Sequence, residues 1–190
     1  HAAMPERGAD PIVAAAQLIM ALQTIPSRRL SPQESTVVSI TQISGGEAIN
    51  VLPDKVVLRG TFRCLNNQVR ERVRGLIESY VAAQPQVSDV EGKIAWYPGY
   101  PVTTNHPAEA QKVREVASAL LGESAVIWNG NPSMASEDFA CMLEACPGAY
   151  FWIGTDGETA SKPLHNASYD FNDELIPHGV ALWTTLVETL

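Results

Sequence analysis

Residues 36–65 read TVVSITQISGGEAINVLPDKVVLRGTFRCL, and this segment predicts two consecutive β-strands joined by a loop. The first strand, residues 36–43, is rich in β-branched side chains, and the second, residues 56–65, alternates apolar and polar ones. Gly45 and Gly46 end the first strand with a flexible turn. The segment therefore places a pair of strands at the centre of the first half of the chain.

Helices are predicted on both sides of this strand pair. Asp10 and Pro11 form a helix start, and apolar residues recur after them at helical spacing. After the second strand, residues 68–83 have an amphipathic pattern, and residues 93–97 (KIAWY) predict a third strand. One more strand before His1 would complete a split β-α-β-β-α-β unit. Because the chain also lacks an initiator methionine, we expect its start to be a cut.

The second half of the chain follows a stretch rich in Pro and Gly at residues 97–101, which we interpret as a domain boundary. Helices and strands alternate beyond this boundary, which indicates an α/β fold too short for a complete sheet. The predicted elements are a helix at residues 107–121, a strand at 125–128, a helix from Ser136, a strand at 149–153 and a helix at 177–190.

Composition excludes several classes of function. The 190 residues carry 13 basic and 21 acidic side chains, and this net charge of −8 argues against nucleic acid or an anionic membrane as partner. No apolar run approaches the roughly 20 residues that span a bilayer, and the first residues, HAAMPERGADP, lack the apolar core of a secretory signal. Three cysteines without CxxC spacing predict free thiols and a cytoplasmic protein.

The histidines form no close metal-binding pair such as HExxH. His165 stands out by its context, because the segment KPLHNASYDFND is a polar loop between an apolar strand and the last helix. Such loops often carry ligands, so His165 is either a metal ligand or an exposed loop residue. We expect His106 and His178, each at a helix start, to be surface residues.

Three other polar positions have two interpretations each. Asn50, in the loop GGEAINVLPD, either presents its amide to a ligand or favours a turn. Arg63, inside the second strand, either faces solvent or binds a carboxylate with its planar guanidinium. Glu137 lies in the segment NPSMASEDF, which either only caps the following helix or forms a binding site, with backbone N–H groups that hold an anion or acids that support a metal ligand.

Five segments in order resemble consecutive motifs of the hippurate hydrolases and related N-acyl-amino-acid amidohydrolases, a group that includes the indole-acetyl-amino-acid hydrolases. These segments are HAAMPERGADPIVAAAQLI, SGGEAINVLPD, RGTFR, SMASEDF and PLHNASYDFND, and they span almost the whole chain. The group belongs with the dinuclear-metal aminoacylases and glutamate-carboxypeptidase-like enzymes. Each motif alone is weakly specific, but five in the right order are strong support for the resemblance.

The resemblance implies an α/β metallopeptidase-like catalytic domain interrupted by a ferredoxin-like lid domain that also forms a homodimer. Residues 1–98 would be the lid, without its first strand, and residues 99–190 the C-terminal part of the catalytic domain. The reaction implied is metal-dependent hydrolysis of an N-acyl amino acid to an amino acid and a carboxylic acid. The implied cofactors are two divalent ions: Zn, Mn, Co or Ni.

The resemblance also implies a role for individual residues. His1 matches a lid histidine that stabilises the oxyanion in the partner subunit's active site, and Asn50 matches a lid asparagine that binds substrate there. Arg63 matches the arginine that holds the substrate's free carboxylate. His165 matches the last metal ligand, and Glu137 matches a residue that supports the metal ligands.

The chain also departs from the pattern of these enzymes. Their general base and remaining metal ligands precede the lid, and none of the corresponding motifs lies in these 190 residues. His165 alone is far from a stable dinuclear site, so we expect the chain by itself to be inactive and not to bind the metals stably. The alternative is that the chain acts only as a dimerisation and binding module. A metal-ligand motif and a Glu-Glu pair before His1 would favour the enzyme.

Overall fold

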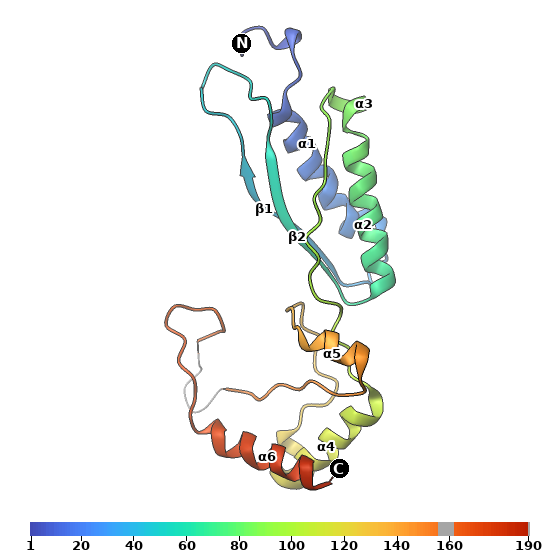
Figure 1. The fold of residues 1–190 in the computed structure, drawn as a ribbon, viewed down its shortest axis with the longest axis vertical. Coiled ribbons are helices and arrows are strands. Elements are labelled where there is room, and N and C mark those ends of the chain that lie inside the picture. Colours follow the sequence, from blue (N-terminus) through green and yellow to red (C-terminus); the bar gives the residue numbers. More distant parts are fainter. Residues whose placement is uncertain (156–161, 190) are drawn as a thin grey trace. The chain divides into compact units, whose positions relative to one another are not determined.

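The computed structural model describes residues 1–155 and 162–189 (Figure 1). The chain divides into two compact units. Unit 1 comprises His1–Val102 together with Pro132–Ser136, and unit 2 comprises Thr103–Asn131 together with Glu137–Leu190. The mixture of helices with a small sheet confirms the mixed class predicted from the sequence. No helix in the described residues combines the length and apolar character needed to cross a membrane.

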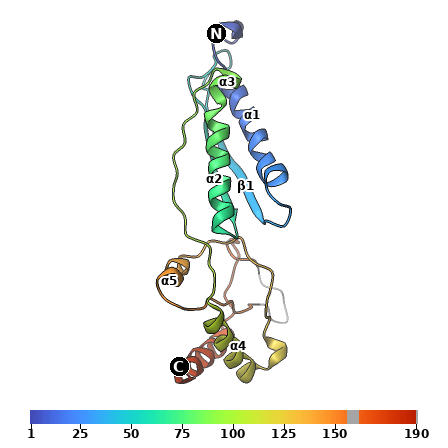
Figure 2. The same cartoon turned by 90° about the vertical axis from the view of Figure 1, so that its right-hand side faces the viewer.

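Unit 1 is built on an antiparallel ribbon of β1 (Thr36–Ser44) and β2 (Val57–Cys64). These bounds confirm the two predicted strands. Both α1 (Pro11–Thr24) and α2 (Asn67–Ala82) lie against one face of the ribbon (Figures 1 and 2). The shorter elements of unit 1 are η1 (Pro5–Arg7), the π-helical turn η2 (Ile25–Arg29) and α3 (Gln84–Ser88).

α1 begins where the sequence predicts and α2 begins one residue before its predicted start, and each has a side chain that caps free amides there. The Asp10 carboxylate accepts hydrogen bonds from the amides of Ile12 and Val13 at the start of α1. The Asn66 side chain accepts from the amides of Gln68 and Val69 at the start of α2. Capping therefore fixes the N-terminal start of each of the two helices that cover the ribbon.

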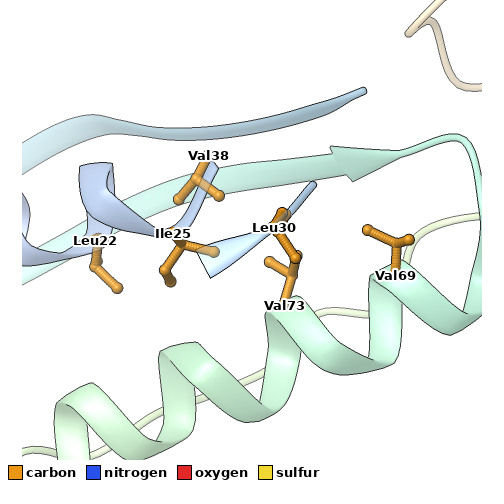
Figure 3. Close-up of a cluster of buried hydrophobic side chains, with 6 residues drawn as sticks. All are labelled: Leu22, Ile25, Leu30, Val38, Val69 and Val73. Atoms are coloured by element: carbon orange, nitrogen blue, oxygen red, sulfur yellow. The ribbon is translucent and has the colours of Figure 1, made fainter. Parts of the chain in front are cut away.

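The core of unit 1 lies between the ribbon and these helices. Its buried side chains come from α1, from the turn that follows it, from β1 and from α2, and Figure 3 shows them pointing toward one another. They are Leu22, Ile25, Leu30, Val38, Val69 and Val73. Ile25 and Val73 are fully buried. Because Val38 and its partner Phe62 face this core, their neighbours Val37 and Arg63 face the opposite side of the ribbon.

The strand predicted at residues 93–97 is wrong. This segment has no regular secondary structure and forms no backbone ladder with the described residues, and a strand needs a partner to satisfy its backbone groups. Trp96 holds the segment instead. Its indole donates to Glu78 Oε1 at 2.9 Å and meets Phe62 edge-on, with 5.7 Å between ring centroids. The ferredoxin-like arrangement of unit 1 therefore stays a prediction, since the described sheet has two strands.

Unit 2 consists of four helical elements in its described part: α4 (Pro107–Leu121), η3 (Glu123–Ala125), α5 (Phe139–Ala145) and α6 (Leu175–Thr189). The bounds of α4 match the predicted helix, and α6 starts two residues before its predicted start. The buried cluster of unit 2 lies between α4 and α6 and consists of Val116, Ala117, Leu182 and Leu186.

Two strands and one helix start were predicted wrongly in unit 2. Residues 125–128 and 149–153 form no strand, because no described segment pairs with their backbone along a ladder. α5 begins at Phe139 rather than Ser136, because the side chain that accepts from the amide of Phe139 is that of Glu137. The three cysteines are free, as predicted, with Cys64 half-buried and the other two exposed. Burial raises the pKa of the Cys64 thiol.

Candidate functional site

His1 and Asn50 lie at the same end of unit 1. The amide of Ala2 donates to the backbone carbonyl of Asn50 at 3.0 Å, which ties the first residues to the loop between β1 and β2. Both side chains are exposed. The His1 imidazole accepts from the amide of Ala3 through Nδ1 at 3.1 Å, which leaves Nε2 as its available donor. The structure therefore brings together two of the residues predicted from the sequence.

The loop that presents Asn50 depends on its two glycines. A Cβ on Gly45 would lie 2.8 Å from the carbonyl oxygen of Lys55, so the two sides of the loop approach closely there. Gly46 has a φ of 82°, a conformation that favours glycine. The close approach at Gly45 and the positive φ at Gly46 explain why this loop has two consecutive glycines.

A hollow of about 1000 Å³ lies beside His1 in unit 1. Its lining comes from the first eleven residues, the loop before β2 and the segment after α3. Charged side chains of both signs surround it: Arg7, Lys55, Lys93, Asp54, Asp89 and Glu91. Asn50 does not line this hollow.

Arg63 lies near the other end of the ribbon. It stands opposite Val37 in β2, half-buried, on the face away from the helices. It forms no ion pair with the described residues, so its guanidinium is free to bind an anion. Six residue steps separate Arg63 from Val57 at the loop end of β2, which corresponds to roughly 20 Å. Within one chain, Arg63 is therefore remote from His1 and Asn50.

His165 lies in a loop of unit 2 with an exposed imidazole. Its φ of 68° is a left-handed conformation, which is uncommon for a residue with a side chain. Turns hold the loop on either side: the amide of Asn166 donates to Pro163 O, and the amide of Tyr169 donates to Asn166 O. An exposed imidazole on a shaped loop fits the role of a single metal ligand.

The described residues do not provide a complete metal centre. Residues 1–155 and 162–189 contain no group of three or more His, Cys, Asp or Glu side chains placed to hold an ion. A stable site needs about four ligands, and His165 is the single ligand predicted from the sequence. The described residues could therefore contribute one ligand to a metal site, but they do not form a complete site.

Glu137 has the best-defined environment of the acidic side chains. Its Oε1 accepts from the amide of Phe139 at 3.1 Å, and its Oε2 accepts from the Tyr150 hydroxyl at 3.0 Å. These donors, with the Phe139 amide as the largest influence, lower the pKa of the Glu137 carboxyl. Burial, together with the neighbouring Glu137 carboxylate, raises the pKa of Tyr150, so its hydroxyl remains a donor. Glu137 is thus held as an oriented carboxylate.

Asn105 was not among the residues predicted from the sequence, and the prediction that His106 is a surface residue is wrong. His106 is half-buried and accepts from the amide of Gly148 through Nδ1 at 3.2 Å. Asn105 pairs with both backbone polar groups of Tyr150. No local signal marks these contacts, because the His106 side chain does not cap α4 and the partners lie 42 and 45 residues further along the chain. His178 is exposed, as predicted.

Comparison with known proteins gives a consistent result. The family model described as peptidase family M20/M25/M40 matches residues 5–189. A hippurate hydrolase of Campylobacter jejuni is 37% identical over 186 residues, which cover 98% of this chain and 48% of the relative. An N-acetyl-L-cysteine deacetylase of Bacillus subtilis is 38% identical over 161 residues, which cover 83% of this chain and 37% of the relative. The chain spans about half the length of the curated relatives it matches, or less.

Solved structures show the same likeness. A putative aminohydrolase from methicillin-resistant Staphylococcus aureus superimposes with a TM-score of 0.83 at 27% identity, covering 98% of this chain and 48% of that one. A dinuclear metal-binding peptidase of the M20 family from Bacillus subtilis superimposes with a TM-score of 0.79 at 25% identity, covering 97% of this chain and 48% of that one. Both the sequence and the fold therefore resemble hydrolases of one family.

Proposed function

This chain belongs to peptidase family M20/M25/M40, and we propose that the protein containing it is a metal-dependent amidohydrolase that cleaves N-acyl amino acids. The products are an amino acid and a carboxylic acid. The names of the relatives support this substrate class, because hippurate and N-acetyl-L-cysteine are both N-acyl amino acids. We assign unit 1 to a lid and dimerisation domain of ferredoxin-like topology, and unit 2 to the C-terminal part of an α/β catalytic domain.

Arg63 is the residue that carries the proposal for substrate binding. Its guanidinium projects from the open face of β2 and has no ion-pair partner among the described residues. An N-acyl amino acid presents one free carboxylate, which a guanidinium binds through two parallel hydrogen bonds. We therefore assign the α-carboxylate of the substrate to Arg63.

In this proposal, His1 and Asn50 contact a different substrate molecule from the one that Arg63 of the same chain binds. A substrate of dipeptide size spans about 7 Å of backbone, whereas roughly 20 Å of strand separates Arg63 from the loop end of the ribbon. One substrate therefore does not reach both ends of one ribbon. In a symmetric homodimer, His1 of one protomer stabilises the oxyanion and Asn50 binds substrate in the site where Arg63 of its partner holds the carboxylate.

The proposed metal centre draws one ligand, His165, from this chain. Divalent ions such as Zn, Mn, Co or Ni, when bound, polarise the amide carbonyl and lower the pKa of a bound water. Glu137 supports a metal-binding histidine by accepting its second ring N–H, for which the carboxylate has lone pairs left. The remaining ligands and the general base belong to segments outside these 190 residues. The three free cysteines favour a cytoplasmic location.

A non-catalytic binding and dimerisation module is the second candidate function. It is favoured by the incomplete ligand set, because no three candidate ligands meet in the described part of the chain. These 190 residues alone should accordingly not hydrolyse an amide, whichever function the complete protein has. A complete protein that binds two divalent ions per protomer would exclude this second candidate.

The substrate assignment is tested with Arg63→Ala in the complete protein, with hippurate as substrate. We expect KM to rise at least tenfold, because truncation removes charge-assisted hydrogen bonds to the carboxylate. Arg59→Ala is the matched control. Arg59 lies four residues before Arg63 on the same face of β2, and its guanidinium already donates to Gln42 Oε1 at 3.5 Å. An unchanged KM for Arg63→Ala would remove Arg63 from the site.

A further inference from the structure

We propose that Asn105, His106 and Tyr150 are positioning residues that fix the Glu137 carboxylate in place. This inference rests on the proposed function, in which Glu137 supports a metal-binding histidine. All four residues lie in unit 2. Hydrogen bonds join Asn105 to Tyr150 and Tyr150 to Glu137, while His106 bonds to Gly148, two residues before Tyr150.

Asn105 takes the place of a neighbouring strand for Tyr150. Its Nδ2 donates to the carbonyl oxygen of Tyr150 at 2.7 Å, and its Oδ1 accepts from the Tyr150 amide at 2.8 Å. A side-chain amide presents a donor and an acceptor in one plane, as a peptide group does. A single side chain therefore reproduces one rung of a β-ladder, and it fixes the backbone of Tyr150 on both sides.

His106 holds the same segment two residues earlier. Its amide donates to the carbonyl oxygen of Gly148 at 3.0 Å, and its Nδ1 accepts from the Gly148 amide at 3.2 Å. Two reciprocal pairs of hydrogen bonds thus flank Ala149. These bonds hold residues 148–150 in place although no described strand lies beside them.

The side chain of Tyr150 connects this fixed backbone segment to Glu137. Its ring contacts Phe139, with 5.8 Å between centroids, and meets Trp152 edge-on at 5.5 Å. Its hydroxyl then donates to Glu137 Oε2, while the Phe139 amide donates to Oε1. With one fixed donor on each oxygen, the plane of the carboxylate is set, and each oxygen keeps lone-pair capacity for a further donor.

Tyr150→Phe tests this arrangement, because it removes the hydroxyl and keeps the ring packing. The measurement is the affinity of the complete protein for Zn²⁺, determined by competition with a chromophoric chelator, alongside kcat and KM. We expect zinc affinity and kcat to fall about tenfold, as is typical when a group behind a metal ligand is lost, with KM within about twofold. Tyr97→Phe is the control, since Tyr97 is 90% exposed.

Asn105→Ala separates positioning from simple stabilisation. If Asn105 acts through Tyr150 and Glu137, the double variant with Tyr150→Phe loses no more zinc affinity than the larger of the two single losses. Additive losses would overturn the inference. If Asn105→Ala does not fold, Tyr150→Phe decides alone: unchanged zinc affinity and kcat would refute the role of the hydroxyl. A wild-type protein that neither binds zinc nor cleaves N-acyl amino acids would instead refute the proposed function itself.

Discussion

At the scale of single residues, Glu137 makes stability depend on pH. Its pKa is lowered in the folded chain by the Phe139 amide and the Tyr150 hydroxyl, both of which favour the charged carboxylate. A lowered pKa stabilises the fold above the unfolded-state value of about 4.3, and this contribution is lost as the pH falls through the folded-state pKa.

We therefore expect Glu137→Gln to lower the apparent thermal unfolding midpoint at pH 7, with the difference from wild type narrowing below about pH 4.3. The measurement is a series of thermal unfolding curves between pH 3 and pH 7. Glu144→Gln is the control, because Glu144 is an exposed residue of α5. A difference that is constant over the whole pH range would contradict the proposed origin of the effect.

Several of these side-chain environments could be predicted from the sequence only in part. The alternation of β2 indicates that Arg63 faces one side of the ribbon, but not that this side is open and without an ion-pair partner. For Asn105 and His106 the sequence shows only a helix start. Their partners lie 45 and 42 residues away in the chain, and local patterns contain no information on contacts of that separation.

At the scale of secondary structure, the register shift in β1 requires a glycine at the facing position of β2. The register shifts between Ile40 and Gln42, and Gly60 stands opposite Ile40. A Cβ on Gly60 would overlap the carbonyl oxygen of Ser39, so the two strands approach too closely there for any side chain. Gly60 thus allows the extra residue of β1, a bulge, to fit within the ribbon.

We expect Gly60→Ala to destabilise the protein by about 1–3 kcal/mol, the usual range for overpacking. Gly75→Ala is the matched control in α2: a Cβ there meets nothing within 4 Å, and alanine is the better helix former by about 0.8–1 kcal/mol. Chemical denaturation of both variants measures the difference. Equal effects of the two substitutions would mean that the close approach at Gly60 relaxes without cost.

Elements with local causes were predictable, and elements with remote causes were not. α1, α2 and α4 follow from apolar periodicity and from local start signals such as Asp10, Asn66 and Pro107. The strands predicted at residues 93–97, 125–128 and 149–153 have suitable composition, but strand formation also requires a paired neighbour. The described residues offer these segments none, and Asn105 partly replaces one for Tyr150.

At the scale of the whole molecule, the residues at the two ends of the ribbon provide a test of the proposed homodimer. Mixing His1→Ala with Arg63→Ala protein should restore activity, because each mixed dimer has one site with His1 from one protomer and Arg63 from the other. Half of the dimers are mixed after random exchange, and one of their two sites is intact, so about a quarter of wild-type activity is expected. The measurement is hippurate hydrolysis after subunit exchange, at a hippurate concentration well below KM, where dimers of Arg63→Ala contribute little activity.

The outcome distinguishes two arrangements of the site. If His1 and Arg63 of the same chain served one substrate, every site in the mixture would lack one of them, and activity would stay at the level of the single variants. Separate incubation of each variant under the exchange conditions controls for effects of the procedure. A restored fraction well above a quarter would indicate that the mixed dimer forms preferentially.

The β1–β2 ribbon also limits how such proteins can change during evolution. Its length sets the distance between Arg63 and the loop that carries Asn50, and so between the two groups proposed to bind substrate. Inserting one residue into β2 would turn Arg63 toward the helices, whereas inserting two would keep its face and move it by about 7 Å. Insertions should therefore be tolerated in the loop between the strands far more readily than within them.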